Sequence, residues 1–163
     1  MPLKPQLVEI LEAMKALGMK PMHELSPVDA REQMEAGVRA RNVTPIELGS
    51  IEEQSIPGPH GDIPVRIYRP KGASGPLGAL VYYHGGGHVI GSMDTHDGVA
   101  RAMCKDANIV VLSVDYRMGP EAKFPAAVDD CYAATKWLSD NEDAMGVRAD
   151  RIAVGGDSAG GNL

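Results

Sequence analysis

Two glycine-rich segments, each directly behind a short apolar run, constrain this chain more than any other feature. The sequence HGGG at residues 84–87 follows the apolar run 79–83, and GDSAG at 156–160 follows the apolar residues 152–154. An apolar run bounded by turn residues is typical of a strand that is covered on both faces. The two segments therefore predict tight turns at the ends of two strands.

The elements around these turns predict an α/β fold. Ile63, Val65 and Ile67 alternate with polar residues, as in a half-buried strand. Strands that alternate with helices favour a mostly parallel sheet flanked by helices. Further strands are expected at 77–83, 109–114 and 151–155, and helices at 99–106 and 126–138, the latter with Val128, Cys131, Tyr132, Thr135 and Leu138 on one side.

The first 45 residues carry a helical pattern instead. Apolar side chains recur at helical spacing from Leu7 to Leu17, and Gly18 is a natural end. A second helix is expected after Ser26, which can cap it, with Pro27 in its first turn. The two helices either pack on a core or form a lid over a site, and periodicity alone favours the core.

Composition narrows the class of protein. At 163 residues the chain is long enough for one domain with a real core. A net charge of −6 and a pI near 5.3 argue against nucleic acid or an anionic membrane as partner. We expect no signal peptide and no membrane span, because no apolar run is long enough.

The cysteines and histidines indicate neither a disulfide framework nor a metal site. Cys104 and Cys131 lie in predicted helices and are expected to be buried and reduced, which fits a cytoplasmic location. No cluster of His, Cys and Asp has the spacing of metal ligands. No metal or organic cofactor is therefore expected.

Ser158 occupies the centre of the pattern G-x-S-x-G behind a strand, the arrangement of a nucleophile elbow. A serine hydroxyl needs a fixed geometry and a base to act as a nucleophile. The sharp turn from strand to helix supplies the geometry, and Gly156 and Gly160 let the backbone pass neighbouring elements closely. We interpret Ser158 as a catalytic nucleophile; the alternative is a tight turn without chemistry.

The HGGG segment suits a loop that stabilises an oxyanion. Acyl transfer builds a negative tetrahedral oxygen, and each backbone N–H aimed at it lowers the barrier by about 3 kcal/mol. Gly85 and Gly86 are the expected donors from this loop, with Ala159 as the third. His84 is expected to brace the loop through its imidazole rather than act as a base, and Gly87 to support it. A phosphate-binding loop is disfavoured, because the spacing is not G-x-G-x-x-G and no Lys-Ser/Thr pair follows.

Further motifs accompany these segments: DTHD at 94–97, DYR at 115–117, Pro120-Glu121, FPAA at 124–127 and the extension of the second segment to GDSAGGN at 156–162. From about residue 50 to Leu163 the chain thereby resembles the hormone-sensitive-lipase-like branch of the α/β-hydrolases, the bacterial family IV carboxylesterases. The resemblance implies an α/β-hydrolase fold, with residues 1–45 as a helical cap segment and residues 46–163 as the N-terminal half of the catalytic domain.

The same resemblance implies a serine carboxylic-ester hydrolase that works through an acyl-enzyme on Ser158. Oxyanion donors are implied at Gly85, Gly86 and Ala159, and small-molecule esters with short to medium acyl chains are the implied substrates. It also favours the lid interpretation of residues 1–45.

The rest of a triad is expected elsewhere. In α/β-hydrolases the triad follows the chain order Ser, Asp or Glu, His, and this sequence ends at Leu163. The acid and the histidine are expected on the C-terminal half of the enzyme, in the same polypeptide or as a second chain, so the 163 residues alone are predicted to be inactive. An inactive truncated product and a non-catalytic small-molecule binding module are the alternatives, and a homo-oligomer is left open.

Two departures from the family pattern stand out. His88 follows the glycines where the family more often has an aromatic residue, and it either reshapes the alcohol side of the pocket or is a spectator. Met118-Gly119 replaces the more usual Leu-Ala in a segment where Arg117 and Glu121 are expected to brace the loop. Of the remaining polar residues near the motifs, Asp157 is expected to point away from the nucleophile.

Overall fold

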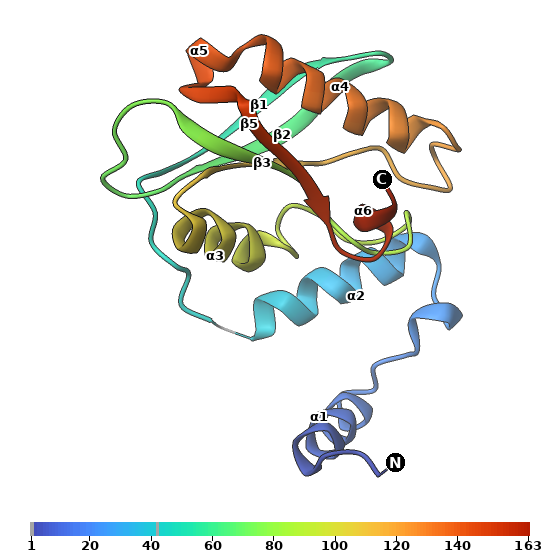
Figure 1. Ribbon diagram of the computed structural model, residues 1–163. Helices are drawn as coiled ribbons and strands as arrows, with labels where there is room; N and C mark the ends of the chain where they lie inside the picture. Colours follow the sequence, from blue (N-terminus) through green and yellow to red (C-terminus); the bar gives the residue numbers. More distant parts are fainter. Residues whose placement is uncertain (1, 42) are drawn as a thin grey trace.

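The computed structural model describes residues 2–41 and 43–163, and its centre is a mixed five-stranded sheet in the order β1-β2-β4-β3-β5 (Figure 1). β3 pairs in parallel with both β4 and β5, whereas β2 pairs antiparallel with β1 and β4. The two glycine motifs therefore follow neighbouring parallel strands, β3 and β5, and lie together at the carboxyl ends of these strands. The strands are β1 (Ser50–Gly58), β2 (Gly61–Arg69), β3 (Leu77–Tyr83), β4 (Val110–Val114) and β5 (Val147–Gly156).

The predicted strands are confirmed where the chain is apolar. Every residue of β4 is buried, and Ile63, Val65 and Ile67 of β2 point into the core while the residues between them are more exposed. The first strand, β1, has no such pattern, because of its residues only Ile56 is buried. Its antiparallel pairing with β2, through the tight turn from Gly58 to Gly61, is what makes it a strand.

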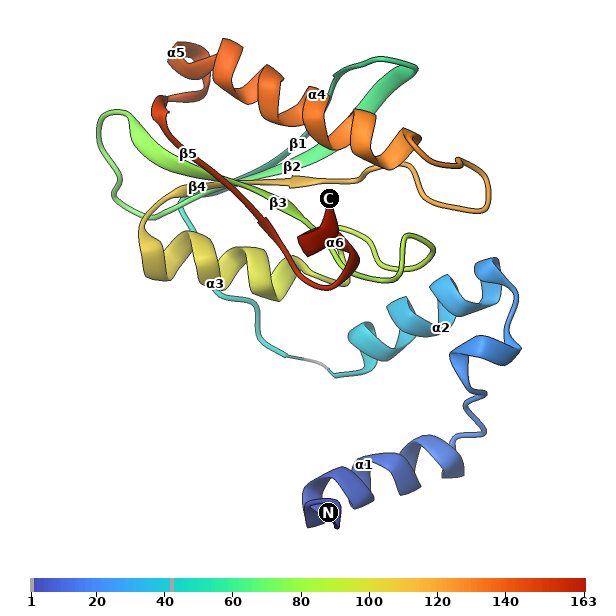
Figure 2. The ribbon, with the colours of Figure 1, turned by 45° about the vertical axis from the view of Figure 1, so that its right-hand side comes forward.

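Helices cover both faces of the sheet (Figures 1 and 2). Residues of α4 (Ala126–Asp140) pack with β1, β2, β3, β4 and β5 in the larger core cluster. Residues of α3 (Asp97–Ala107) pack with Tyr68, Tyr82 and Val111 on the opposite face. Cys104 and Cys131 are buried, unpaired thiols in these two helices, as expected. Two short helices complete this part of the chain, α5 (Glu142–Met145) and α6 (Ala159–Asn162).

The buried side of α4 differs from the prediction. Val128 and Tyr132 are 42% and 71% exposed, although the sequence pattern placed them beside Cys131 and Leu138. The buried side instead includes Asp130, whose carboxylate accepts two hydrogen bonds from the guanidinium of Arg117, at 2.7 Å and 2.8 Å. The ion pair offsets the cost of burying this carboxylate, and Cys131 and Leu138 of the predicted side are buried beside it.

The N-terminal segment forms the two expected helices, α1 (Pro5–Ala16) and α2 (Pro27–Ala40), joined by a short 3-10 helix η1 (Met22–Glu24). Gly18 follows α1 with a φ of 67°, and the hydroxyl of Ser26 caps α2 by accepting from the Asp29 N–H. The expectation that both helices pack on a core is wrong. α1 buries none of its residues and α2 buries only Ala30, so both lie outside the core clusters, and Figure 2 shows α1 standing apart from the sheet.

One arginine fastens α2 to the rest of the molecule. The guanidinium of Arg31 donates to the carbonyl oxygens of Val89 and Gly119, each at 2.7 Å, and pairs with both oxygens of the Glu121 carboxylate. The hydrogen bonds from Arg31 lower the pKa of Glu121 to about 2. Glu121 and Arg117 thus brace the loop as expected, but through partners on α2 and α4. Among residues 2–41 and 43–163, none of the helices is long and apolar enough to cross a membrane.

Candidate active site

Ser158 lies at the turn between β5 and α6, with φ of 51° and ψ of −113°. A residue with a side chain rarely adopts a positive φ, and holding it there costs about 1–3 kcal/mol. The serine is exposed, and its Oγ has no hydrogen-bond partner within the described part of the chain. The strand-to-helix turn therefore presents the hydroxyl outward in a strained conformation.

The glycines on either side of Ser158 are required by close backbone packing. A Cβ on Gly156 would overlap the carbonyl oxygen of Tyr83, and a Cβ on Gly160 would overlap the backbone of Tyr83 and the carbonyl oxygen of His84. The elbow thus rests directly on the backbone at the end of β3. This contact brings the second glycine motif against the first.

The variant Gly160→Ala is expected to destabilise the complete protein by about 1–3 kcal/mol, because the new methyl group displaces the backbone of β3. Urea unfolding measures the difference. The matched control is Gly98→Ala in α3, where a Cβ meets nothing within 4 Å and where alanine favours the helix. Equal stability of Gly160→Ala and the parent protein would contradict the packing argument.

The loop after β3 is a tight turn that depends on glycine. The carbonyl oxygen of Gly86 accepts from the N–H groups of Val89 and Ile90, at 3.1 Å and 3.0 Å. Gly86 has a φ of 123°, and a Cβ there would overlap the carbonyl of Ile90. The next residues, Gly87 and His88, also have positive φ values of 62° and 61°. A chain of ordinary residues would not adopt this path.

The N–H of Gly85 has a different partner from the one expected. It donates to Oδ1 of Asp157 at 2.9 Å, so it is not free to donate to an oxyanion. The N–H groups of Gly86 and Ala159 have no acceptor among residues 2–41 and 43–163. Of the three expected donors, these two remain available.

Asp157 is the residue of this site that sequence reasoning missed. Its Oδ1 also accepts from the hydroxyl of Tyr82 at 2.7 Å and lies 3.6 Å from Nε2 of His96. Burial works to raise the pKa of Asp157, but Tyr82, His96 and the Gly85 N–H together lower it. The only sequence signal is its position beside the nucleophile, which does not identify these partners.

His84 is buried beneath the loop. Its Nδ1 donates to the carbonyl oxygen of Gly85 at 2.8 Å, and its ring stacks on Tyr116 with the centroids 4.5 Å apart. The hydroxyl of Tyr116 donates to the His84 carbonyl at 2.6 Å. Burial lowers the pKa of His84, which favours a neutral imidazole. These contacts hold the first residue of the loop against the core.

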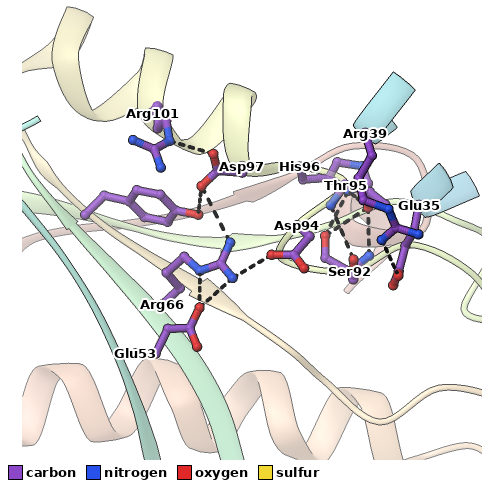
Figure 3. A network of polar contacts seen from close by, with 11 residues as sticks. Glu35, Arg39, Glu53, Arg66, Ser92, Asp94, Thr95, His96, Asp97 and Arg101 are labelled. Atoms are coloured by element: carbon purple, nitrogen blue, oxygen red, sulfur yellow. Dashed lines mark hydrogen bonds and ion pairs between the residues drawn. The ribbon is translucent and has the colours of Figure 1, made fainter. Parts of the chain in front are cut away.

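A polar cluster supports the segment that carries His96 (Figure 3). Arg66 of β2 lies between three carboxylates, those of Glu53, Asp94 and Asp97, at 2.5–3.5 Å. Asp97 also accepts from the hydroxyl of Tyr68 at 3.0 Å and pairs with Arg101. Next to this cluster, the hydroxyl of Thr95 lies 2.9 Å from Nδ1 of His96. The cluster fixes the start of α3, and with it the imidazole that faces Asp157.

Two cavities adjoin the glycine motifs. One of about 540 Å³ is lined by the elbow residues Gly156 and Asp157, by α2, and by several methionines. The other, of about 350 Å³, is lined by His88, Phe124 and Leu163. The N-terminal helices thus lie over one side of the site and His88 borders the other. The methionines of the larger cavity are Met14, Met19, Met22, Met34 and Met103.

Comparison with known proteins identifies the fold family of this chain. Residues 80–163 match a family described by its α/β hydrolase fold. The carboxylic ester hydrolase LipN of Mycobacterium tuberculosis is 54% identical over 114 residues, which are 69% of this chain and 30% of LipN. The ethyl acetate hydrolase of Pseudomonas putida is 39% identical over 100% of this chain and 54% of that protein.

A solved structure is similar along nearly the whole chain. The esterase of Pyrobaculum calidifontis superimposes with a TM-score of 0.86 and 45% identity, covering 99% of this chain and 50% of that one. The chain thus spans between about a third and about half of the curated relatives described above.

Proposed function

Since this chain belongs to the hormone-sensitive-lipase-like carboxylesterases of the α/β-hydrolase superfamily, we propose that the complete protein hydrolyses carboxylic esters through an acyl-enzyme on Ser158. The observation that carries the proposal is the backbone of Ser158, held at a positive φ in a strand-to-helix turn against the HGGG loop. Strain of this kind, at an exposed serine, is expected where the hydroxyl has a chemical role.

In the proposed reaction, Oγ of Ser158 attacks the ester carbonyl carbon and its proton passes to a base. The tetrahedral oxyanion accepts hydrogen bonds from the N–H groups of Gly86 and Ala159. Collapse of this intermediate breaks the bond to the alcohol, which leaves with the proton from the base, and the acyl group stays on Ser158. Water, activated by the same base, then releases the carboxylic acid.

We propose that the acid and the histidine of the triad lie outside these 163 residues. Oγ of Ser158 has no hydrogen-bond partner in the described part of the chain, and the relatives above are about two to three times as long as the matched region. The Nδ1 of His84 is occupied by the Gly85 carbonyl, and His96 faces Asp157. Residues 1–163 alone are accordingly expected to be inactive.

For the substrate we propose esters with short to medium acyl chains, bound beneath a cap that includes residues 1–45, with residues 46–163 as part of the catalytic domain. The cavity of about 540 Å³ beside Asp157, lined by flexible methionines, supports an apolar and adaptable site. One relative is named for hydrolysing ethyl acetate, a short ester.

We also propose a cytoplasmic location, which the buried, unpaired thiols of Cys104 and Cys131 support.

A serine-directed fluorophosphonate tests this proposal. The complete protein is expected to form one covalent adduct, located at Ser158 by peptide mass, and to hydrolyse p-nitrophenyl butyrate faster than p-nitrophenyl palmitate. Residues 1–163 expressed alone are expected to show no turnover. Absence of both the adduct and ester hydrolysis in the complete protein would reject the function, and turnover by the 163 residues alone would reject the placement of the triad.

A further inference from the structure

We propose that Asp157 is the positioning residue of the oxyanion loop: its carboxylate holds Gly85 in place so that the next N–H along the chain, that of Gly86, faces the reacting carbonyl. The inference rests on the proposed ester hydrolysis and adds a residue to it. Asp157 itself touches no reacting atom in this scheme, and it acts through the loop that it holds.

One oxygen joins three parts of the site. Oδ1 of Asp157, which belongs to the elbow, accepts from the N–H of Gly85 in the loop at 2.9 Å and from the hydroxyl of Tyr82 in β3 at 2.7 Å. The Gly86 N–H lies in the same planar peptide group as the Gly85 carbonyl, which accepts from Nδ1 of His84 at 2.8 Å. With the N–H of Gly85 held by Asp157 and its carbonyl held by His84, the direction of the Gly86 N–H is restricted. The elbow and the loop therefore keep a set separation.

The lack of room for a side chain at Gly85 is a second observation that supports this contact. A Cβ at Gly85 would overlap Oδ2 of Asp157 and lie 3.0 Å from its carbonyl oxygen. The loop backbone thus sits directly on the carboxylate, closer than any residue with a side chain allows. Glycine at 85 serves this approach, rather than donation to the oxyanion.

The surroundings of Asp157 favour an ionised carboxylate. Tyr82 and Gly85 both donate to it, and Nε2 of His96 lies 3.6 Å from the same oxygen. An ionised acceptor forms shorter and stronger hydrogen bonds than a neutral one. The imidazole of His96 is itself held by the hydroxyl of Thr95, in the segment just before α3.

Steady-state hydrolysis of p-nitrophenyl butyrate by the complete protein tests the proposal, with urea unfolding run in parallel. Asp157→Ala is expected to lower kcat by about 10- to 100-fold, the scale of a misplaced catalytic group, and to leave KM within about threefold. Asp157→Asn keeps a carbonyl oxygen that accepts both hydrogen bonds, so it is expected to recover most of that loss. Tyr82→Phe removes one of the two donors and is expected to lower kcat by about three- to tenfold.

Tyr83→Phe is the matched control, because Tyr83 is the next residue of β3 and its hydroxyl donates to the Cys131 carbonyl of α4, at 3.0 Å, on the opposite face of the sheet from Asp157. It is expected to lose as much stability as Tyr82→Phe and to keep its kcat. Should Asp157→Ala fail to fold, this pair of tyrosine variants decides alone.

Wild-type kcat in Asp157→Ala, an Asn variant no better than Ala, or equal kcat in the two tyrosine variants would overturn the positioning role. Ester turnover and fluorophosphonate labelling of the wild-type protein report on the proposed function separately. If the proposed function is wrong, the wild-type protein shows neither turnover nor labelling, and this is known before any variant is compared.

Discussion

Ser158→Ala in the complete protein is expected to lower kcat for p-nitrophenyl butyrate by about a millionfold while the fold persists, the loss typical of removing a nucleophile that acts within a triad. Alanine can follow the same backbone path at the elbow. Because Oγ makes no hydrogen bond in the described part of the chain, its removal is expected to leave the free energy of unfolding nearly unchanged. Turnover followed over days, together with urea unfolding, measures both quantities.

Ser139→Ala is the control for this substitution, because Ser139 is an exposed residue near the end of α4 and its side chain makes no hydrogen bond in the described part of the chain. Its kcat is expected to equal that of the parent. Hydrolysis by Ser158→Ala within tenfold of the parent would show that another group is the nucleophile.

Gly86→Val is expected to lower kcat by about 100- to 1,000-fold, the scale of one lost oxyanion donor. The φ of 123° at Gly86 is strained for valine, and the new side chain would overlap the carbonyl of Ile90. The loop must shift to accommodate it, which carries the Gly86 N–H away from the oxyanion. Steady-state kinetics and fluorophosphonate labelling rates both report this loss.

The control for Gly86→Val is Gly72→Val. Gly72 also has a positive φ, of 67°, but a Cβ there meets nothing within 4 Å and the residue lies in the turn between β2 and β3. Valine at this position costs backbone strain without touching the loop, so stability falls and kcat stays. A Gly86→Val enzyme with parental kcat would remove Gly86 from the oxyanion site.

The parts of the fold that follow from the sequence are those where burial decides the local pattern. β3 is a continuous apolar run and every residue of β4 is buried, and the first glycine motif lies directly behind β3, where its apolar run predicts a turn. β1 was not predictable in this way, since its pairing with β2 rather than its own side chains holds it. The buried side of α4 was predicted only in part: Cys131 and Leu138 are buried, but Tyr132 is exposed and Asp130, paired with Arg117, is buried instead.

The sequence predicts the backbone turns of the site, but it does not predict which side chains contact them. Glycine spacing indicates a turn from the sequence alone, but the hydrogen bond from Gly85 to Asp157 joins residues 72 positions apart. The contact from Arg31 to Val89 spans 58 positions. Such contacts depend on which strands become neighbours, and no local pattern encodes that.

Main chain meets main chain at the elbow, where Gly156 and Gly160 rest on the backbone of Tyr83 with no side chain between them. Side chains lose rotamer freedom when they are ordered, at a free-energy cost that glycine does not incur. The groups proposed to hold the oxyanion, the N–H of Gly86 and that of Ala159, are likewise backbone atoms. Their alignment is completed when the chain folds, so binding an ester there carries almost no entropic penalty for ordering the donors.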